Sequence, residues 1–182
     1  MKPLGRSRGF STYERLALWG WEAGALTAEN QMGSQLKLAA EHPEKARRTL
    51  EQVIEFKEAL YRILSSAVQS KPFNPADLGL INAALDRAND FMIIEYCEQN
   101  EFTFAFKGQA DELDGMLWPV IKSAVDLLMS KELKKVKMCE GGTCGWIFID
   151  TTRNRSRRWC SMDDCGNPEK ARRHYKRKTS QK

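Results

Sequence analysis

Apolar residues recur at helical spacing through most of the first 130 residues. The clearest stretch begins at His42-Pro43, because proline is favoured at the first position of a helix. Between Leu50 and Val68, most of its apolar residues repeat at intervals of three or four along the chain. This is the spacing of one face of a helix with 3.6 residues per turn. The sequence therefore predicts one long helix that begins at His42-Pro43 and is broken by Lys71-Pro72-Phe73-Asn74-Pro75.

Weaker patterns predict further helices on either side of the long one. Asn74-Pro75 predicts an N-cap followed by the first turn of a helix. Its inward positions are predicted to be Leu78, Ile81, Leu85 and Ala88. The other helices are predicted over residues 13–23, 28–41 and 117–128.

The pattern changes between residues 91 and 107, where strand-forming residues replace the helical repeat. The run 91–97 is rich in them, and Phe102, Phe104 and Phe106 alternate with smaller residues. Alternation with a period of two is typical of a β-strand. A small β-hairpin is therefore predicted near 91–107, and the fold class is mainly α with a small β-hairpin (α+β).

Charge changes sign near residues 131–135. The net charge is +5 over 182 residues, but residues 151–182 carry +8 and the preceding 150 residues carry −3. A strongly basic tail on a slightly acidic body is expected when one end of a chain meets a polyanion. The sequence predicts a helical domain over 1–133 and a small zinc-ribbon-like or treble-clef-like module over 134–182.

Four of the five cysteines lie in this small module. Cys139 and Cys144 form one C-x4-C pair, and Cys160 and Cys165 form a second pair after fifteen intervening residues. Two short-spaced pairs suit a tetrahedral Zn²⁺ ion, and four thiolates leave no open position for a catalytic water. One structural zinc ion per chain is therefore predicted, with incidental cysteines or disulfides as the alternatives. Cys97, alone in a predicted strand, is interpreted as a small core residue.

Basic residues occupy two stretches. One is the interval between the two cysteine pairs, and the other is the helix predicted to begin at Pro168. Lys and Arg neutralise phosphates, and Arg and Asn can also bind base edges. The alternatives are a solvated surface, compensation of the zinc–thiolate charge, and binding of a protein or of RNA. The predicted nucleic-acid contacts are Arg153, Asn154, Arg155, Arg157, Arg158, Asn167, Lys170, Arg172, Arg173, Lys176 and Arg177.

No catalytic constellation is evident, and the chain is predicted not to be an enzyme. Only two histidines are present, and we find no Gly-rich phosphate loop. No apolar run approaches the roughly 18 residues of a transmembrane helix, and residues 1–10 lack the apolar centre of a secretion signal. A soluble, cytoplasmic protein without a membrane partner is expected.

Three segments of the module resemble the CGNR zinc finger family. They are Cys144-Gly-Trp-Ile-Phe-Ile-Asp150, Arg153-Asn-Arg-Ser-Arg-Arg-Trp-Cys160-Ser-Met and Cys165-Gly-Asn167. The helical region before them, ending in Ser123-Ala-Val-Asp-Leu-Leu128, is similar to the ABATE domain.

The resemblance implies a bacterial, stress-responsive transcription regulator. Its zinc ligands would be Cys139, Cys144, Cys160 and Cys165, its finger would bind DNA, and its N-terminal domain would sense a small molecule or a protein. Pro168 stands where the family signature has Arg, so Arg172 or Arg173 would take over any contact of that residue. A zinc-stabilised protein-interaction or RNA-binding module is the alternative function, and a homodimer is left open.

Overall fold

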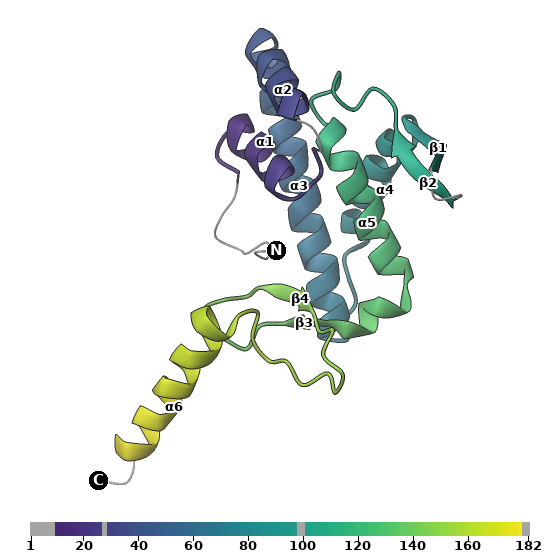
Figure 1. Ribbon diagram of the computed structural model, residues 1–182. Coiled ribbons are helices and arrows are strands. Elements are labelled where there is room, and N and C mark those ends of the chain that lie inside the picture. The colour runs from purple at the N-terminus through teal and green to yellow at the C-terminus, as the bar shows by residue number, and fades with distance from the viewer. Residues whose placement is uncertain (1–9, 27–28, 98–100, 180–182) are drawn as a thin grey trace. The chain divides into compact units, whose positions relative to one another are not determined.

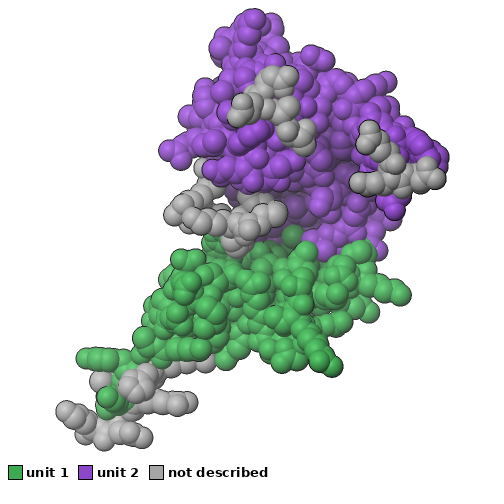
Figure 2. Space-filling view, in the orientation of Figure 1, with its two compact units in different colours: residues 1–9, 64–73, 130–182 green, residues 10–63, 74–129 purple. Residues whose placement is uncertain are grey.

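The computed structural model describes residues 10–26, 29–97 and 101–179. They divide into two compact units, coloured separately in Figure 2. The larger unit contains residues 10–63 and 74–129, and the smaller unit contains residues 64–73 together with the described residues from 130 onward. Among the described residues, no helix combines the length and the apolar character needed to span a bilayer.

The larger unit is built mainly of helices (Figure 1). Their N-terminal caps follow from the sequence: the Thr12 side chain accepts a hydrogen bond from the Arg15 amide, and Asn74 accepts one from the Ala76 amide. The predicted helical character and the predicted start at Asn74-Pro75 are confirmed. The helices are α1 (Tyr13–Glu22), α2 (Glu29–Glu41), α3 (Pro43–Val68, whose last turns belong to the smaller unit), α4 (Pro75–Asn89) and α5 (Trp118–Met129).

The core of the larger unit centres on Trp118, which is completely buried. Its ring stacks on that of Phe91, with centroids 4.1 Å apart, and the guanidinium of Arg87 lies 4.5 Å from the centroid of the Phe91 ring. Leu16 and Met116 are also fully buried in this cluster. Burial of such large apolar side chains is the main favourable term in folding, so these residues hold the helices together.

One inward position predicted for α4 is wrong. Ile81 and Ala88 are buried as predicted, but Leu78 is 39% exposed and Asp77 is 4% exposed in its place. The reason is a bidentate pair, in which Arg62 of α3 donates to the Asp77 carboxylate at 2.7 Å and 3.0 Å. The guanidinium lowers the pKa of Asp77 and keeps its carboxylate charged. Charge pairing between helices therefore sets the rotation of the first turn of α4.

A polar network fixes the connection between the β-hairpin and α5. Gln35 is fully buried, and its side-chain amide donates to the backbone oxygens of Gln109 at 3.0 Å and Glu112 at 2.7 Å. The Tyr13 hydroxyl lies 2.5 Å from the Gln35 oxygen and 2.6 Å from the Leu113 oxygen. Buried backbone oxygens need such partners because water cannot reach them. The network thus holds a segment without regular structure in one conformation.

The predicted β-hairpin is confirmed. Strands β1 (Met92–Cys97) and β2 (Glu101–Phe106) are antiparallel, with Met92 opposite Phe106 and Tyr96 opposite Phe102. The ring of Phe106 lies 6.1 Å from that of Trp118, which joins the base of the hairpin to the core.

From residue 130 onward, the described part of the smaller unit contains a second antiparallel hairpin and the helix α6. They are β3 (Val136–Met138), β4 (Ile147–Ile149) and α6 (Asn167–Thr179). A short 3₁₀ helix (Lys131–Lys135) precedes β3, and a π-helical turn (Met162–Gly166) leads into α6. The fold class is therefore mainly helical with two small hairpins, of which the sequence predicted the first explicitly.

Gly115 offers a test of how tightly the connection between the β1–β2 hairpin and α5 is packed. A Cβ atom at Gly115 would lie 2.1 Å from the Gln109 oxygen. We expect Gly115→Ala to lower the free energy of unfolding by about 1–3 kcal/mol, as overpacking does. Gly79→Ala is the control, because nothing lies within 4 Å of its Cβ position in the middle of α4. It should raise stability by about 0.5–1 kcal/mol, and urea denaturation measures both. Equal effects of the two substitutions would contradict the packing described.

Candidate functional site

The four cysteines of the small unit come from two segments, the loop between β3 and β4 and the turn before α6. Cys139 follows β3, and its amide donates to the Trp146 oxygen at 2.7 Å, so the hairpin continues as far as the first cysteine pair. Cys144 closes the tight loop, since its amide donates to the Gly141 oxygen at 3.0 Å. Cys160 lies just before the π-helical turn, and Cys165 lies within it, next to its last residue. Two short segments thus supply two sulfur atoms each.

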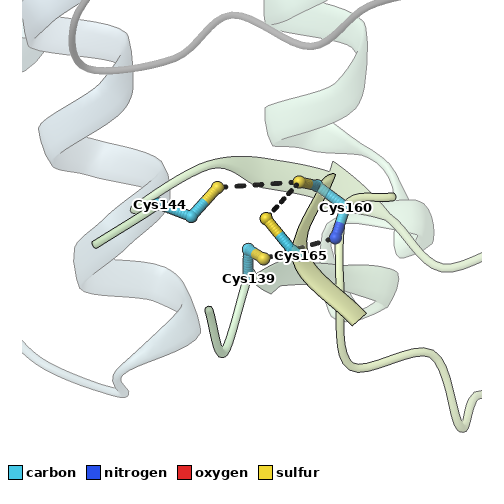
Figure 3. A group of neighbouring side chains, drawn as sticks. All are labelled: Cys139, Cys144, Cys160 and Cys165. Atoms are coloured by element: carbon cyan, nitrogen blue, oxygen red, sulfur yellow. Dashed lines mark hydrogen bonds between the residues drawn. The ribbon is translucent and has the colours of Figure 1, made fainter. Parts of the chain in front are cut away.

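The sulfur atoms lie where a tetrahedral ion would require them. All four Sγ atoms are within 4.8 Å of one another, and Figure 3 shows them gathered around one point. The Sγ of Cys160 lies 3.6 Å from that of Cys144 and 3.7 Å from that of Cys165. Four Zn–S bonds of about 2.3 Å at tetrahedral angles place sulfur atoms about 3.8 Å apart. The donor set and its spacing therefore fit Zn²⁺, and the four thiols are free.

The surroundings of the sulfur atoms favour the charged thiolate at Cys139 and the neutral thiol at Cys160 and Cys165. Burial raises the pKa of Cys139, but hydrogen bonds outweigh burial and lower it: the amides of Cys160 and Gly141 lie 3.4 Å from its Sγ, and the side chains of Cys160 and Cys144 add to the effect. Burial raises the pKa of Cys160 and, to about 11, that of Cys165. Four thiolates at neutral pH consequently need a cation between them. Cys97, the fifth cysteine, is half-buried in β1 and is not part of the cluster.

Asp150 organises the loop that follows β4. Its side chain is completely buried and accepts from the Lys137 ammonium at 2.7 Å. It also accepts from the Thr152 hydroxyl at 2.6 Å and from the amides of Thr152 and Arg157 at 3.0 Å and 2.9 Å. The Lys137 and Thr152 bonds are the strongest influences that lower its pKa, so Asp150 is charged at neutral pH. One carboxylate therefore joins both ends of the loop to the hairpin.

Lys137 completes this arrangement from β3. Its ammonium contacts the backbone oxygens of Arg155 and, at 3.3 Å, Arg157. Arg155 has a left-handed backbone (φ 50°), and its amide donates to the Thr152 oxygen at 3.1 Å. The segment 151–157, which we call the basic loop, is thus fixed along its backbone while its residues are exposed.

The predicted nucleic-acid contacts of the basic loop fall into two groups. No described residue pairs with the guanidinium of Arg153 or Arg155, and both residues are exposed. In contrast, the Arg157 guanidinium donates to the Trp159 oxygen at 2.9 Å and to the Cys160 oxygen, and lies 4.7 Å from the centroid of the Phe148 ring. Next to the loop, Arg158 donates to the Glu140 carboxylate at 2.8 Å. These two arginines serve the module internally.

The remaining predicted contacts lie on or beside α6. The Lys170 ammonium is 5.7 Å from the Trp159 ring centroid, and Arg172 pairs with Glu169 at 3.2 Å. Asn167 donates weakly to Asp163 at 3.4 Å, and Asn154 of the loop accepts from Ser156 at 2.9 Å. The side chains of Arg173, Lys176 and Arg177 lie outside the described residues, although their backbone belongs to α6.

Pro168 occupies the first turn of α6, where a missing amide hydrogen costs nothing. With Arg172 it lines a hollow of about 70 Å³ beside Cys144 and Cys165. Arg172 lies directly over Gly142, since a Cβ there would come 3.3 Å from its Nη1 atom. Arg172 thus lies beside the loop between Cys139 and Cys144, where its guanidinium also pairs with Glu169.

Sequence reasoning missed Asp150, Lys137 and Glu140 as parts of the site. A signal existed for Asp150, because Asp commonly accepts from the backbone two residues later, as it does here from Thr152. The Lys137 and Glu140 contacts join residues about eighteen positions apart, and no local pattern indicates them.

Comparison with known families agrees with this description. The family model of the CGNR zinc finger matches residues 135–178. The model of the ABATE family, whose description reads "Putative stress-induced transcription regulator", matches residues 3–131. No curated protein matches the chain.

The role of Asp150 is testable by removing its charge alone. We expect Asp150→Asn to lower the thermal stability of the small unit and to speed amide exchange at Thr152 and Arg157, because Lys137 loses its carboxylate partner. Thermal unfolding and hydrogen exchange by NMR measure the two effects. Asp163→Asn, an equal charge change at an exposed position of the same unit, is the control. Equal behaviour of both variants would contradict the assigned role.

Proposed function

Because the chain belongs to the ABATE family and carries a CGNR zinc finger, we propose that it is a zinc-containing transcription regulator that binds DNA. In this proposal it acts in the cytoplasm of a bacterium and catalyses no reaction. The observation that supports it best is the basic loop, which Asp150 and Lys137 fix beside the cysteine cluster. A fixed backbone lowers the entropy lost when exposed side chains bind a partner.

One Zn²⁺ ion per chain is proposed, held by Cys139, Cys144, Cys160 and Cys165. The sulfur distances of 3.6 Å and 3.7 Å support this stoichiometry. When bound, the ion supplies folding free energy and no catalysis, because four thiolates fill its coordination shell. Amide donors from Gly141 and Cys160 and the guanidinium of Arg172 would reduce the net negative charge of the filled site.

DNA is proposed to meet the tip of the basic loop first. Arg153 and Arg155 are exposed and without a described partner, so binding a phosphate would cost neither of them an internal ion pair. To bind a phosphate, Arg157 would have to leave the Phe148 ring and two backbone oxygens, and Arg158 would have to leave the Glu140 carboxylate. We therefore assign phosphate contact to Arg153 and Arg155 and assign bracing of the module to Arg157 and Arg158.

The larger unit is proposed to sense a small molecule or a protein. The feature that favours this role is a hollow of about 410 Å³ beside α1, α2 and α3. Its lining is mainly apolar, with Leu36, Ala39 and Leu50, and includes the charged residues Glu14 and Arg47. Small-molecule sites commonly combine an apolar lining with a few polar groups in this way.

The zinc proposal predicts one metal ion per chain by elemental analysis. Cys139→Ser and Cys165→Ser should each lose the ion, whereas Cys97→Ser, whose sulfur lies outside the cluster, should retain it. Chelation should unfold residues 136–166 and leave the larger unit folded, because the core of that unit contains none of the four cysteines. Amide NMR spectra with and without chelator report this directly. A small unit that stays folded without metal would refute the proposal.

The DNA proposal predicts that affinity for a random duplex falls as salt is added, so that log Kd rises linearly with log salt concentration. Arg153→Gln and Arg155→Gln remove charge at nearly constant length, and each should weaken binding to all sequences and reduce the salt slope by about 1. Fluorescence anisotropy of labelled duplexes with zinc-loaded protein measures both quantities.

Arg48→Gln is the matched control, since it removes one exposed arginine from α3 and should change nothing. RNA of the same length serves as a competitor. Equal binding of RNA would favour the RNA-binding alternative. No binding of either nucleic acid at low salt would favour a protein-interaction module instead.

A further inference from the structure

The hairpin of the larger unit has one face composed of large apolar side chains. Because successive residues of a strand point to opposite faces, the register places six such residues on one side: Met92, Ile94, Tyr96, Phe102, Phe104 and Phe106. The opposite side is mixed: it carries Glu95, Glu101 and Thr103 together with Ile93, Ala105 and Cys97. Both charged residues of the two strands therefore lie on one side, and the other side carries no charge.

Among the described residues of the unit, those that cover this apolar face lie at its base. Phe106 contacts Trp118, and the Lys122 ammonium lies 4.9 Å from the centroid of the Phe104 ring. Farther out, the exposed fractions are 69% for Ile94, 60% for Tyr96, 74% for Phe102 and 53% for Phe104. Figure 1 shows the two strands at the margin of the unit, beyond α4 and α5. We call these four exposed residues the hairpin patch.

The hairpin patch is large for a surface that meets only water. With about 200 Å² for each large side chain, the four residues expose roughly 500 Å². Contiguous apolar patches of this size commonly mark interaction sites. A two-stranded hairpin is also only marginally stable unless a further element packs on it. A partner that covers the patch would therefore bury apolar surface and also stabilise the hairpin.

We propose that a second copy of this chain covers the hairpin patch, so that the protein forms a two-fold symmetric dimer. The patch contains no charged residue, and two copies can meet face to face without burying an unpaired charge. Joining two patches buries about 1,000 Å², which is the lower limit for a specific interface. Because interfaces at this lower limit are weak, the dimer forms in a concentration-dependent equilibrium with the monomer.

The test uses the zinc-loaded full chain without nucleic acid, so that its result is independent of DNA binding. Sedimentation velocity from about 1 to 200 µM should show a monomer–dimer equilibrium. Ile94→Thr and Phe102→Thr keep a strand-forming residue but remove apolar area, and each should raise the dimer dissociation constant at least tenfold. Glu95→Thr and Glu101→Thr change the opposite side of the same strands and should leave the constant unchanged.

Circular dichroism of each variant establishes that it is folded, and at least one of the two patch variants must be folded for the comparison. A chain that is monomeric at every concentration would overturn the proposal. So would a dimer that both patch variants leave intact, because another surface would then hold it together. Equal weakening by the patch and control variants would also overturn it.

Discussion

The convergence of four cysteine sulfur atoms on one point is the constraint on which the small unit depends. Among the described residues, its buried cluster consists of Cys139, Phe148 and Cys160, with Cys144, Trp146, Trp159 and Cys165 partly buried around them. Strands of three residues and a core this small gain little hydrophobic free energy. The sulfur cluster joins the β3–β4 loop to the turn before α6, and a metal ion at its centre would supply the free energy that apolar burial does not.

A second constraint, the buried carboxylate of Asp150, acts on the segment between the two cysteine pairs. Its bonds to Lys137, Thr152 and Arg157 hold a loop that has no regular hydrogen bonding of its own. The loop carries several arginines close together, and their mutual repulsion opposes a compact conformation. Asp150 and Glu140 each offset part of this repulsion, and the rings of Phe148 and Trp159 receive guanidinium groups. Within the part of the chain that the structure describes, the charge at Arg153 and Arg155, at the tip of the loop, has no such compensation.

Local patterns predicted most of the fold and the centre of the site. Helical spacing, the Asn74-Pro75 start, the alternation at Phe102–Phe106 and the C-x4-C pairs all act over a few residues, and so they could be read directly. Contacts between distant residues could not. Arg62 and Asp77 rotate the first turn of α4 so that Leu78 is exposed, and Lys137 meets Asp150 only once β3 and β4 are paired. Whether Arg157 or Arg153 faces outward depends on those pairings as well.

The two units consequently owe their stability to different physical terms. The larger unit has a core of buried apolar residues around Trp118 and Leu16, and this core contains none of the four clustered cysteines. The small unit relies on sulfur, a buried carboxylate and the donors around them. Heat and denaturant act on both units, since both expose surface on unfolding. Loss of a metal ion, by contrast, would act on the cysteine cluster and on the basic loop attached to it. The basic loop, which carries the exposed Arg153 and Arg155, is therefore in the part of the chain whose folding would respond to metal supply.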